Sequence, residues 1–201
     1  VGDYRIGGPV PRGALVLTCG VDVQGDRLEA RVWGWGRGEE SWLIAREVIH
    51  GSPTADETWA ALDELLFRSW PHEAGGTLRI TATAVDAGDG NTTHHVRNYA
   101  RKWAHRHVIA TKGQAVQGKP ILGRPTEQDI THRGKTMRGA VKLWPLGSDT
   151  AKAVIYARYK ISTPGPGYVH LPQGLPDTEY AEMTAEKVVT RYVKGFARRA
   201  W

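Results

Sequence analysis

Apolar and polar positions follow a strand-like pattern over most of the first fifty residues. Residues 14–23 are almost wholly apolar, which favours a central strand buried on both faces. Residues 27–35 alternate polar and apolar side chains, as in a strand with one wet face, and a third strand is expected over 41–49. Short turns at 24–26 and 36–38 join these strands, so the pattern predicts an antiparallel meander.

The hydrophobic period becomes helical after residue 53. Thr54 and Glu57 have the spacing of a capping box, and the apolar residues that follow lie on one helical face: Trp59, Leu62, Leu65 and Leu66. Beyond this helix we expect a fourth strand, a second helix capped by Asn91 or Thr92, and a fifth strand, over 78–86, 92–106 and 107–111.

The second half of the chain is less regular. Residues 112–138 are polar and glycine-rich without periodicity, so a long mobile loop is expected there. Later segments predict short strands over 141–144 and 168–171 and two helices, one capped by Asp149 and one running from Thr178 to about Lys194 with Asp177 as its cap. The order of elements predicts an α/β domain with a mixed sheet, in which three antiparallel strands are followed by parallel strands, flanked by helices.

Composition narrows the class of protein. The chain has 201 residues, 40% of them hydrophobic and 24% charged, which suits one soluble domain over residues 14–195. No apolar run approaches the roughly 20 residues of a membrane-spanning helix, so no membrane association is expected. The single cysteine, Cys19, excludes an internal disulfide and is expected to be a buried strand residue in a reducing cytoplasm. A net charge of +6 favours a polyanionic partner without establishing one.

Two acidic residues stand at the ends of otherwise apolar strands. Asp22 and Asp86 each follow such a run, where an unpaired carboxylate is costly. If the two strands are parallel neighbours, both carboxylates project from one edge of the sheet. Like charges that close raise each other's pKa unless a divalent cation binds between them. A single acid at a strand end more often caps the next turn, so the two sites together carry the hypothesis of a metal site.

A third acid is harder to place. Glu179 lies in the first turn of the last predicted helix and Glu182 one turn later, while Asp177 and Asp149 are further candidates. The helix dipole favours acids in a first turn without any metal, so position alone does not choose among them.

A series of motifs resembles the nuclease domain of lambda-type phage terminase large subunits. The first is Gly-Val-Asp-Val-Gln at 20–24, followed by Asp-Arg-Leu-Glu at 26–29. Others keep the order of the family at 34–36, 40–42, 85–88, 112–113, 147–152, 165–170 and 179–186. The resemblance covers about residues 10–191.

The resemblance implies a ribonuclease H-like fold and a metal-dependent endonuclease that cleaves concatemeric double-stranded DNA. Carried over by position, Asp22, Asp86 and Glu179 are the catalytic acids and ligands of Mg²⁺ or Mn²⁺, expected as two ions. The second family motif usually reads Asp-Ser-Gly-Gly-His. Here residues 86–90 read Asp-Ala-Gly-Asp-Gly, so this loop departs from the family pattern after its first residue.

The same resemblance implies partners and a setting. Residues 1–13 are then the linker from an N-terminal ATPase domain, because no phosphate loop occurs: the Gly-Lys-Thr at 134–136 has Asp129 where a leading glycine is required. Residues 196–201 are expected to be a basic tail. The implied partners are double-stranded DNA and, in the full-length protein, the terminase small subunit and the portal. The implied location is the host cytoplasm, in the packaging motor and not in the mature virion.

Basic residues of the predicted loop are candidates for DNA contact: Lys112, Lys119, Arg124, Arg133, Lys135 and Arg138. Lys112 could neutralise the scissile phosphate. Two alternatives stay open at this stage. One is a non-catalytic module of the same fold that binds DNA or the packaging motor, and the other is a nuclease of the resolvase or transposase type.

Overall fold

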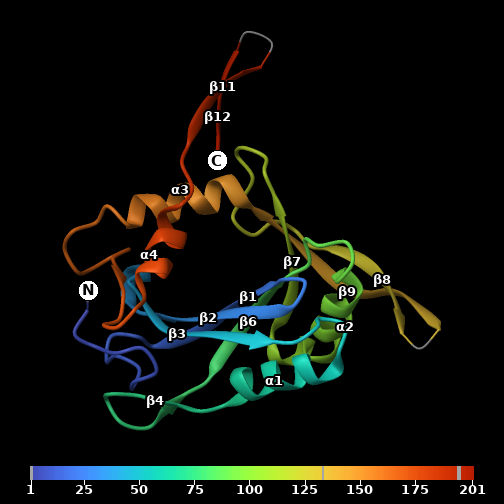
Figure 1. The fold of residues 1–201 in the computed structure, drawn as a ribbon, viewed down its shortest axis with the longest axis horizontal. Helices are drawn as coiled ribbons and strands as arrows, with labels where there is room; N and C mark the ends of the chain where they lie inside the picture. The colour runs from blue at the N-terminus through green and yellow to red at the C-terminus, as the bar shows by residue number, and fades with distance from the viewer. Residues whose placement is uncertain (1, 133, 194–195) are drawn as a thin grey trace.

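The fold is built around one mixed sheet, shown in the computed structural model in Figure 1. The structure describes residues 2–132, 134–193 and 196–201. The sheet has the strand order β10-β3-β2-β1-β6-β7-β9-β8. Its strands are β1 (Val16–Val23), β2 (Arg27–Trp35), β3 (Ser41–His50), β6 (Ile80–Asp86), β7 (Val108–Gln114), β8 (Thr126–His132), β9 (Lys135–Gly147) and β10 (Val169–His170).

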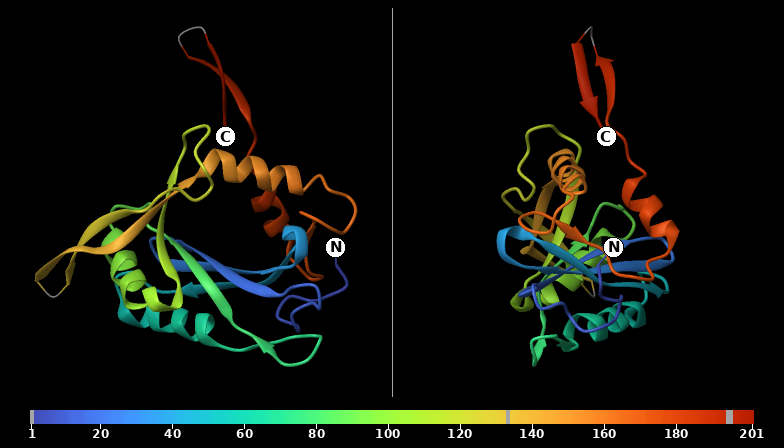
Figure 2. Two further views of the ribbon diagram at one scale, coloured as in Figure 1. Left: turned by 180° about the vertical axis from the view of Figure 1, so that it is seen from behind. Right: turned by 90° about the vertical axis from the view of Figure 1, so that its left-hand side faces the viewer.

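Helices cover both faces of this sheet. The helices are α1 (Asp56–Phe67), α2 (Thr93–Lys102), α3 (Ser148–Arg158) and α4 (Asp177–Thr184), with 3-10 turns η1 (Arg37–Glu39) and η2 (Ala104–Arg106). Figures 1 and 2 show α1 and α2 on one side and α3 and α4 on the other. The short strands β4 (Trp70–Pro71) and β5 (Thr77–Leu78) form a separate hairpin. None of the helices in the described part of the chain is long and apolar enough to cross a membrane.

The predicted antiparallel meander is confirmed. β1 pairs with β2 over its whole length, and β2 pairs with β3. In β2, every second side chain is buried and the others stay partly exposed, as the alternating sequence predicts. The partly exposed side chains, among them Glu29, Arg31 and Trp33, lie on one face of the strand.

The predicted change to parallel strands is also confirmed. β1 pairs in parallel with β6, β6 with β7, and β7 with β9. β8 returns antiparallel to β9 and forms one edge, and β10 pairs in parallel with β3 at the other. The arrangement is a mixed α/β sheet flanked by helices and is compatible with a ribonuclease H-like fold.

The main core lies between the sheet and the helices α1 and α2. Leu62 of α1 and Val96 of α2 are completely buried against strand residues such as Leu17 and Val85. Each such side chain contributes about 1.5–3 kcal/mol through the water-exposed surface that it removes. Cys19 is buried in β1, as expected, and burial raises the pKa of its thiol to about 12.

The opposite face is packed less tightly. α3 has no buried residue along its length, and a pocket of about 220 Å³ remains between it and the sheet. That pocket is lined by Trp33 and Trp35 of β2 and by Ile155 and Tyr159 from α3 and its end. Polar contacts along α3 help to hold it: Thr150 donates to the carbonyl of Lys119, Lys152 forms an ion pair with Glu186, and Arg158 forms an ion pair with Glu39.

The capping box predicted at Thr54 is wrong. Ala55 is the N-cap residue of α1 and makes no side-chain cap hydrogen bond. The hydroxyls of Ser52 and Thr54 are bonded to each other at 2.8 Å, and the Thr54 N–H donates to Ser52 Oγ. The preceding turn therefore uses the hydroxyl that the sequence pattern assigned to the helix end.

The long loop predicted over 112–138 is wrong in extent, because of its described residues only 115–125, between β7 and β8, form an irregular connection and much of the rest is sheet. β7 continues to Gln114, and β8 and β9 form a ribbon that projects beyond the sheet (Figure 1). Strand periodicity was hidden because this ribbon has few buried positions: of its described side chains only Ile130 and Val141 are buried apolar residues. Where few positions are buried, few need to be apolar, and the two-residue period is hard to recognise.

The C-terminal segment departs from prediction as well. α4 ends at Thr184, and β11 (Val189–Val193) and β12 (Phe196–Ala200) then form a hairpin. The helix expected to reach Lys194 was therefore too long, and the predicted basic tail contains a strand. The β-branched residues Val188, Val189 and Thr190 favour extended backbone over helix. The predicted caps Asp149 and Asp177 lie in the first turns of α3 and α4, with Gly147 and Pro176 as N-cap residues.

Residues 2–13 pack on the sheet, although their backbone is mostly irregular. Val10 is completely buried, and Tyr4 is 9% exposed. The Tyr4 hydroxyl donates toward the carbonyl oxygens of Leu43 at 3.0 Å and His170 at 2.9 Å. Tyr4 therefore ties the start of the chain to β3 and β10.

We expect Tyr4→Phe to destabilise the protein by about 1–3 kcal/mol, because the buried contact with the Leu43 carbonyl and the partly buried contact with the His170 carbonyl are lost. Urea denaturation measures the change, with Asp3→Asn, at an exposed neighbour, as control. Equal stability of Tyr4→Phe and the wild type would mean that the Tyr4 hydroxyl does not help to hold residues 2–13 on the sheet.

Candidate active site

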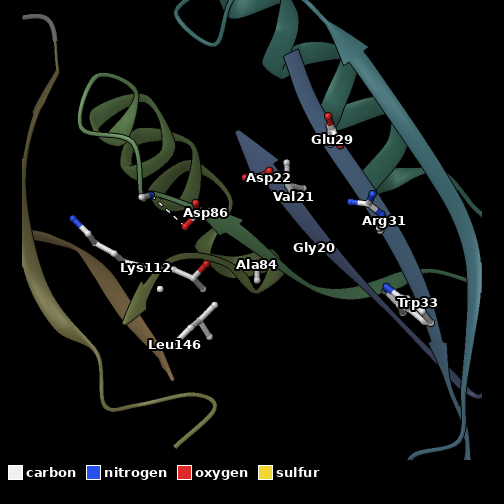
Figure 3. A pocket seen from close by; sticks show the side chains of 13 residues that line it. Gly20, Val21, Asp22, Glu29, Arg31, Trp33, Ala84, Asp86, Lys112 and Leu146 are labelled. Atoms are coloured by element: carbon white, nitrogen blue, oxygen red, sulfur yellow. Dashed lines mark hydrogen bonds between the residues drawn. The ribbon is translucent and has the colours of Figure 1, made fainter. Parts of the chain in front are cut away.

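Two carboxylates lie together at one edge of the central sheet, as the sequence predicts. The parallel pairing of β1 with β6 places Val21 opposite Val85, and the next residue on each strand is an aspartate. Figure 3 shows Asp22 and Asp86 side by side at the ends of these strands. Both line one open pocket of about 620 Å³, called here the acid pocket.

Small residues form the floor of the acid pocket. Gly20 of β1 and Ala84 of β6 are paired in the sheet and both line the pocket. A Cβ atom built on Gly20 would meet no other atom within 4 Å, so the space above it is open. The pocket therefore exists because the floor carries almost no side chain.

The environment of Asp86 disfavours its charge. Partial burial raises the pKa of the Asp86 carboxyl, and the neighbouring charge of Asp22 raises this pKa further. Hydrogen bonds from the backbone N–H groups of Gly88 and Ala87 and the charge of Lys112 act in the opposite direction. Asp22 itself is exposed and accepts a hydrogen bond from the side-chain amide of Gln24. Such a pair favours binding of a cation, because a positive charge removes the repulsion.

The two carboxylates fit a hard divalent cation. Mg²⁺ is commonly held by one or two protein carboxylates, while water and substrate phosphate oxygens complete its coordination. An open pocket that contains Asp22 and Asp86 offers these ligands and leaves room for a phosphate. Within the described ranges, no three His, Cys, Asp or Glu side chains form a group that could hold a metal ion.

Glu179, the predicted third ligand, lies elsewhere on the same face. It is completely buried, and it is not among the described residues that line the acid pocket. Its carboxylate accepts from Arg31 Nη2 at 3.3 and 3.4 Å and forms an ion pair with Arg46 Nε. Its role as a metal ligand stays a prediction.

The other candidates for a third acid lie outside the acid pocket too. Glu182 is 52% exposed and pairs with Arg31 at 2.9 Å. Asp177 is exposed at the start of α4, and Asp149 lines a different pocket beside Thr150.

Sequence reasoning missed two charged residues of the acid pocket, Glu29 and Arg31. Both lie on β2, where Glu29 is opposite Asp22 and Arg31 is opposite Gly20. Glu29 forms an ion pair with Arg27 at 2.8 Å. The signal was present, because a two-residue alternation after a tight turn places these side chains on the face that carries Asp22.

The predicted DNA-contacting residues fall in two places. Lys112 follows Thr111 on β7, is exposed and lines the acid pocket. Lys119 and Arg124 lie exposed in the connection between β7 and β8, and Arg138 is exposed on β9. Lys135 is the first residue of β9, and Arg133 lies outside the described residues.

Comparison with known proteins agrees with the resemblance seen in the sequence. Residues 3–201 match the family model described as "Terminase large subunit gpA, endonuclease domain". The chain is 36% identical to the large terminase subunit of Escherichia phage lambda and 32% identical to that of Enterobacteria phage P21. Each alignment covers 96% of this chain and 30% of the relative, so the chain spans less than a third of these proteins. No solved structure matches the chain.

The raised pKa of Asp86 has a consequence for stability. Between the ordinary pKa of about 3.8 and the raised value, the folded state binds more protons than the unfolded state. The free energy of unfolding therefore falls as pH rises through this window, and it stays lower at higher pH.

We expect Asp86→Asn to have a higher melting temperature than the wild type at pH 7 without divalent metal. The asparagine keeps an oxygen that can accept from Gly88 N–H but removes the repulsion with Asp22. The advantage should vanish below about pH 3.8, where the carboxyl is protonated in both states. A lower melting temperature for Asp86→Asn at pH 7 would contradict the electrostatic description of the pair.

Proposed function

The chain belongs to the family of terminase large subunit endonuclease domains, and we propose that it cuts concatemeric double-stranded DNA in a reaction that depends on Mg²⁺ or Mn²⁺. The observation that carries the proposal is the position of Asp22 and Asp86 in one open pocket. Family membership supports nuclease activity, and the carboxylate pair supports its dependence on metal.

The chemistry follows from the pocket. Divalent ions held by carboxylates activate water and stabilise the leaving oxygen when a phosphodiester bond is cut. Asp22 and Asp86 would hold these ions, expected as two, and Gly20 leaves room for the phosphate. Glu179 as a third ligand stays a prediction, and in this role it would exchange its arginine partners for the metal.

The chain's own cations would hold the DNA. Lys112 lies close enough to Asp86 to lower the pKa of that carboxyl, and in the same place it can neutralise a phosphate. Lys119, Arg124 and Arg138 are exposed beyond the pocket, and we propose that they contact the DNA backbone. Backbone contacts of this kind position the duplex without reading its sequence. Arg133 and Lys135 belong to the same proposal.

The setting of the activity is proposed from the relatives. They are large terminase subunits more than three times as long as this chain. We infer that the chain works as the nuclease part of such a subunit, together with a small subunit and a portal, in the host cytoplasm during packaging.

A second candidate is a DNA-binding module of the same fold that does not cut. The absence of a three-ligand group among the described His, Cys, Asp and Glu side chains favours it. The two candidates are separated by activity with a divalent metal present.

We expect Asp22→Ala and Asp86→Ala each to lower plasmid nicking in Mn²⁺ by about 10³-fold or more, because each removes a charge that holds the ions. Gel analysis of supercoiled DNA measures the loss. Asp26→Ala, at an exposed acid in the turn after β1, is the matched control and should cut normally. Full activity of Asp22→Ala removes this mechanism, and a wild type that binds DNA but never cuts it favours the second candidate.

Filling the pocket floor should also block cutting. We expect Gly20→Leu to lower nicking by about 100-fold, because the side chain occupies the space where the phosphate must approach. Gly20→Ala adds only the Cβ atom, which meets nothing, and should retain most activity. Thermal denaturation should show no loss of stability in either variant, because glycine weakens a strand. Equal activity of the leucine and alanine variants would place the reacting phosphate elsewhere.

A further inference from the structure

We propose that Arg31 binds a DNA phosphate beside the Asp22–Asp86 pair and that Glu179 is the residue that positions Arg31 for this contact. The inference rests on the proposed function, because it assigns a phosphate-binding role within the same pocket. It also gives Glu179 a role that does not require contact with metal.

Arg31 reaches the acid pocket from the side opposite Lys112. The register of β1 with β2 places Arg31 opposite Gly20. Two residues further along the strands, Glu29 lies opposite Asp22. Gly20 and Ala84 carry no side chain large enough to separate Arg31 from the interior of the pocket. Figure 3 shows Arg31 and Lys112 on opposite sides of the two aspartates. A phosphate above the acids would thus lie between two cations, which offset its repulsion from the carboxylates.

Arg31 has donors to spare for a phosphate. Its contacts with Glu179 and Glu182 are made through Nη2. A guanidinium has five N–H donors, so donors on Nη1 and Nε can serve a second acceptor. The Arg31 side chain is 28% exposed, and this exposure is compatible with access from the pocket. The planar arrangement of these donors suits the oxygens of a phosphate.

Glu179 fixes the place of this guanidinium. Arg31 and Arg46 are opposite each other on β2 and β3, where like charges repel. Glu179 lies on α4, and its carboxylate forms ion pairs with both arginines. It is completely buried, and a buried carboxylate is tolerated only when its charge is compensated. Two guanidiniums supply that compensation, so the position of α4 and the orientation of Arg31 are linked.

The same geometry explains why Glu179 need not hold metal. A carboxylate that already accepts from two guanidiniums has few lone pairs left for a cation. A metal ligand and a positioning residue differ in one measurable respect. Replacing a ligand weakens metal binding without DNA, whereas replacing a positioning residue acts through Arg31.

The test is a double-mutant cycle on the 201-residue protein with Arg31→Ala and Glu179→Gln. The readouts are affinity for a short duplex in Ca²⁺ and kcat/KM for nicking in Mn²⁺. We expect Arg31→Ala to weaken DNA binding about tenfold and lower kcat/KM about 100-fold. Glu179→Gln should lower both less, and should have no further effect when Arg31 is already alanine. Arg31→Lys should recover only part of the loss, because it keeps the charge without the planar donors.

Controls separate positioning from stability. Asp63→Asn, which removes an ion pair with Lys102 on α2, should leave both readouts unchanged. Thermal denaturation checks that each variant is folded. If Glu179→Gln unfolds, Glu179→Asp replaces it in the cycle, because a shorter side chain keeps the buried charge but moves the carboxylate away from Arg31.

Calorimetric measurement of Mn²⁺ binding in the absence of DNA completes the test. We expect unchanged Mn²⁺ affinity in Glu179→Gln and at least a tenfold loss in Asp86→Asn. Normal binding and cutting by Arg31→Ala, additive effects of the two substitutions, or weakened Mn²⁺ binding in Glu179→Gln would each overturn the inference. If the wild type binds DNA through the coupled pair but does not cut, the inference holds and the endonuclease proposal fails.

Discussion

The hydrogen-bonded pairing of β1 with β6 is the constraint on which the site depends. Because the two strands are parallel and pair without a shift from Thr18 to Val21, opposite Ala82 to Val85, the acids that follow leave the sheet at the same edge. The backbones that carry them cannot separate without breaking the strand ladder. The backbone thereby holds together two charges that repel, and the free energy of the core stabilises the arrangement.

Charges around the pair are ordered across the sheet. The carboxylates of Asp22 and Asp86 lie at the centre, while Lys112 on β7 and Arg31 on β2 lie on either side. Farther out, Glu179 and Glu182 neutralise the arginines of β2 and β3. This alternation keeps the buried part of the face neutral and leaves the exposed part suited to a phosphate and a cation. The positions of these charges, more than the net charge of the chain, explain why this face suits a phosphate and a cation.

The sequence predicted those strands and helices that have one buried face and one solvent-exposed face. β2 was predicted with its observed bounds, and Asp22 and Asp86 were predicted to meet, because burial makes periodicity visible. The ribbon of β8 and β9 was missed, since few of its described side chains are buried and its pattern is not periodic. The pairing of Glu179 with Arg31 was also beyond prediction, because it joins residues 148 positions apart and depends on how α4 docks. Long-range ion pairs leave no local signature in a sequence.

α3 lies over the sheet with none of its residues fully buried, although several of them are partly buried. Polar contacts attach it at Thr150, Lys152, Tyr156 and Arg158, and apolar residues such as Ile155 remain 44% exposed. Lifting such a helix exposes little new apolar surface, so the free energy of its local opening is separate from that of global unfolding. This side of the domain can thus rearrange while the strands that carry the acids keep their register.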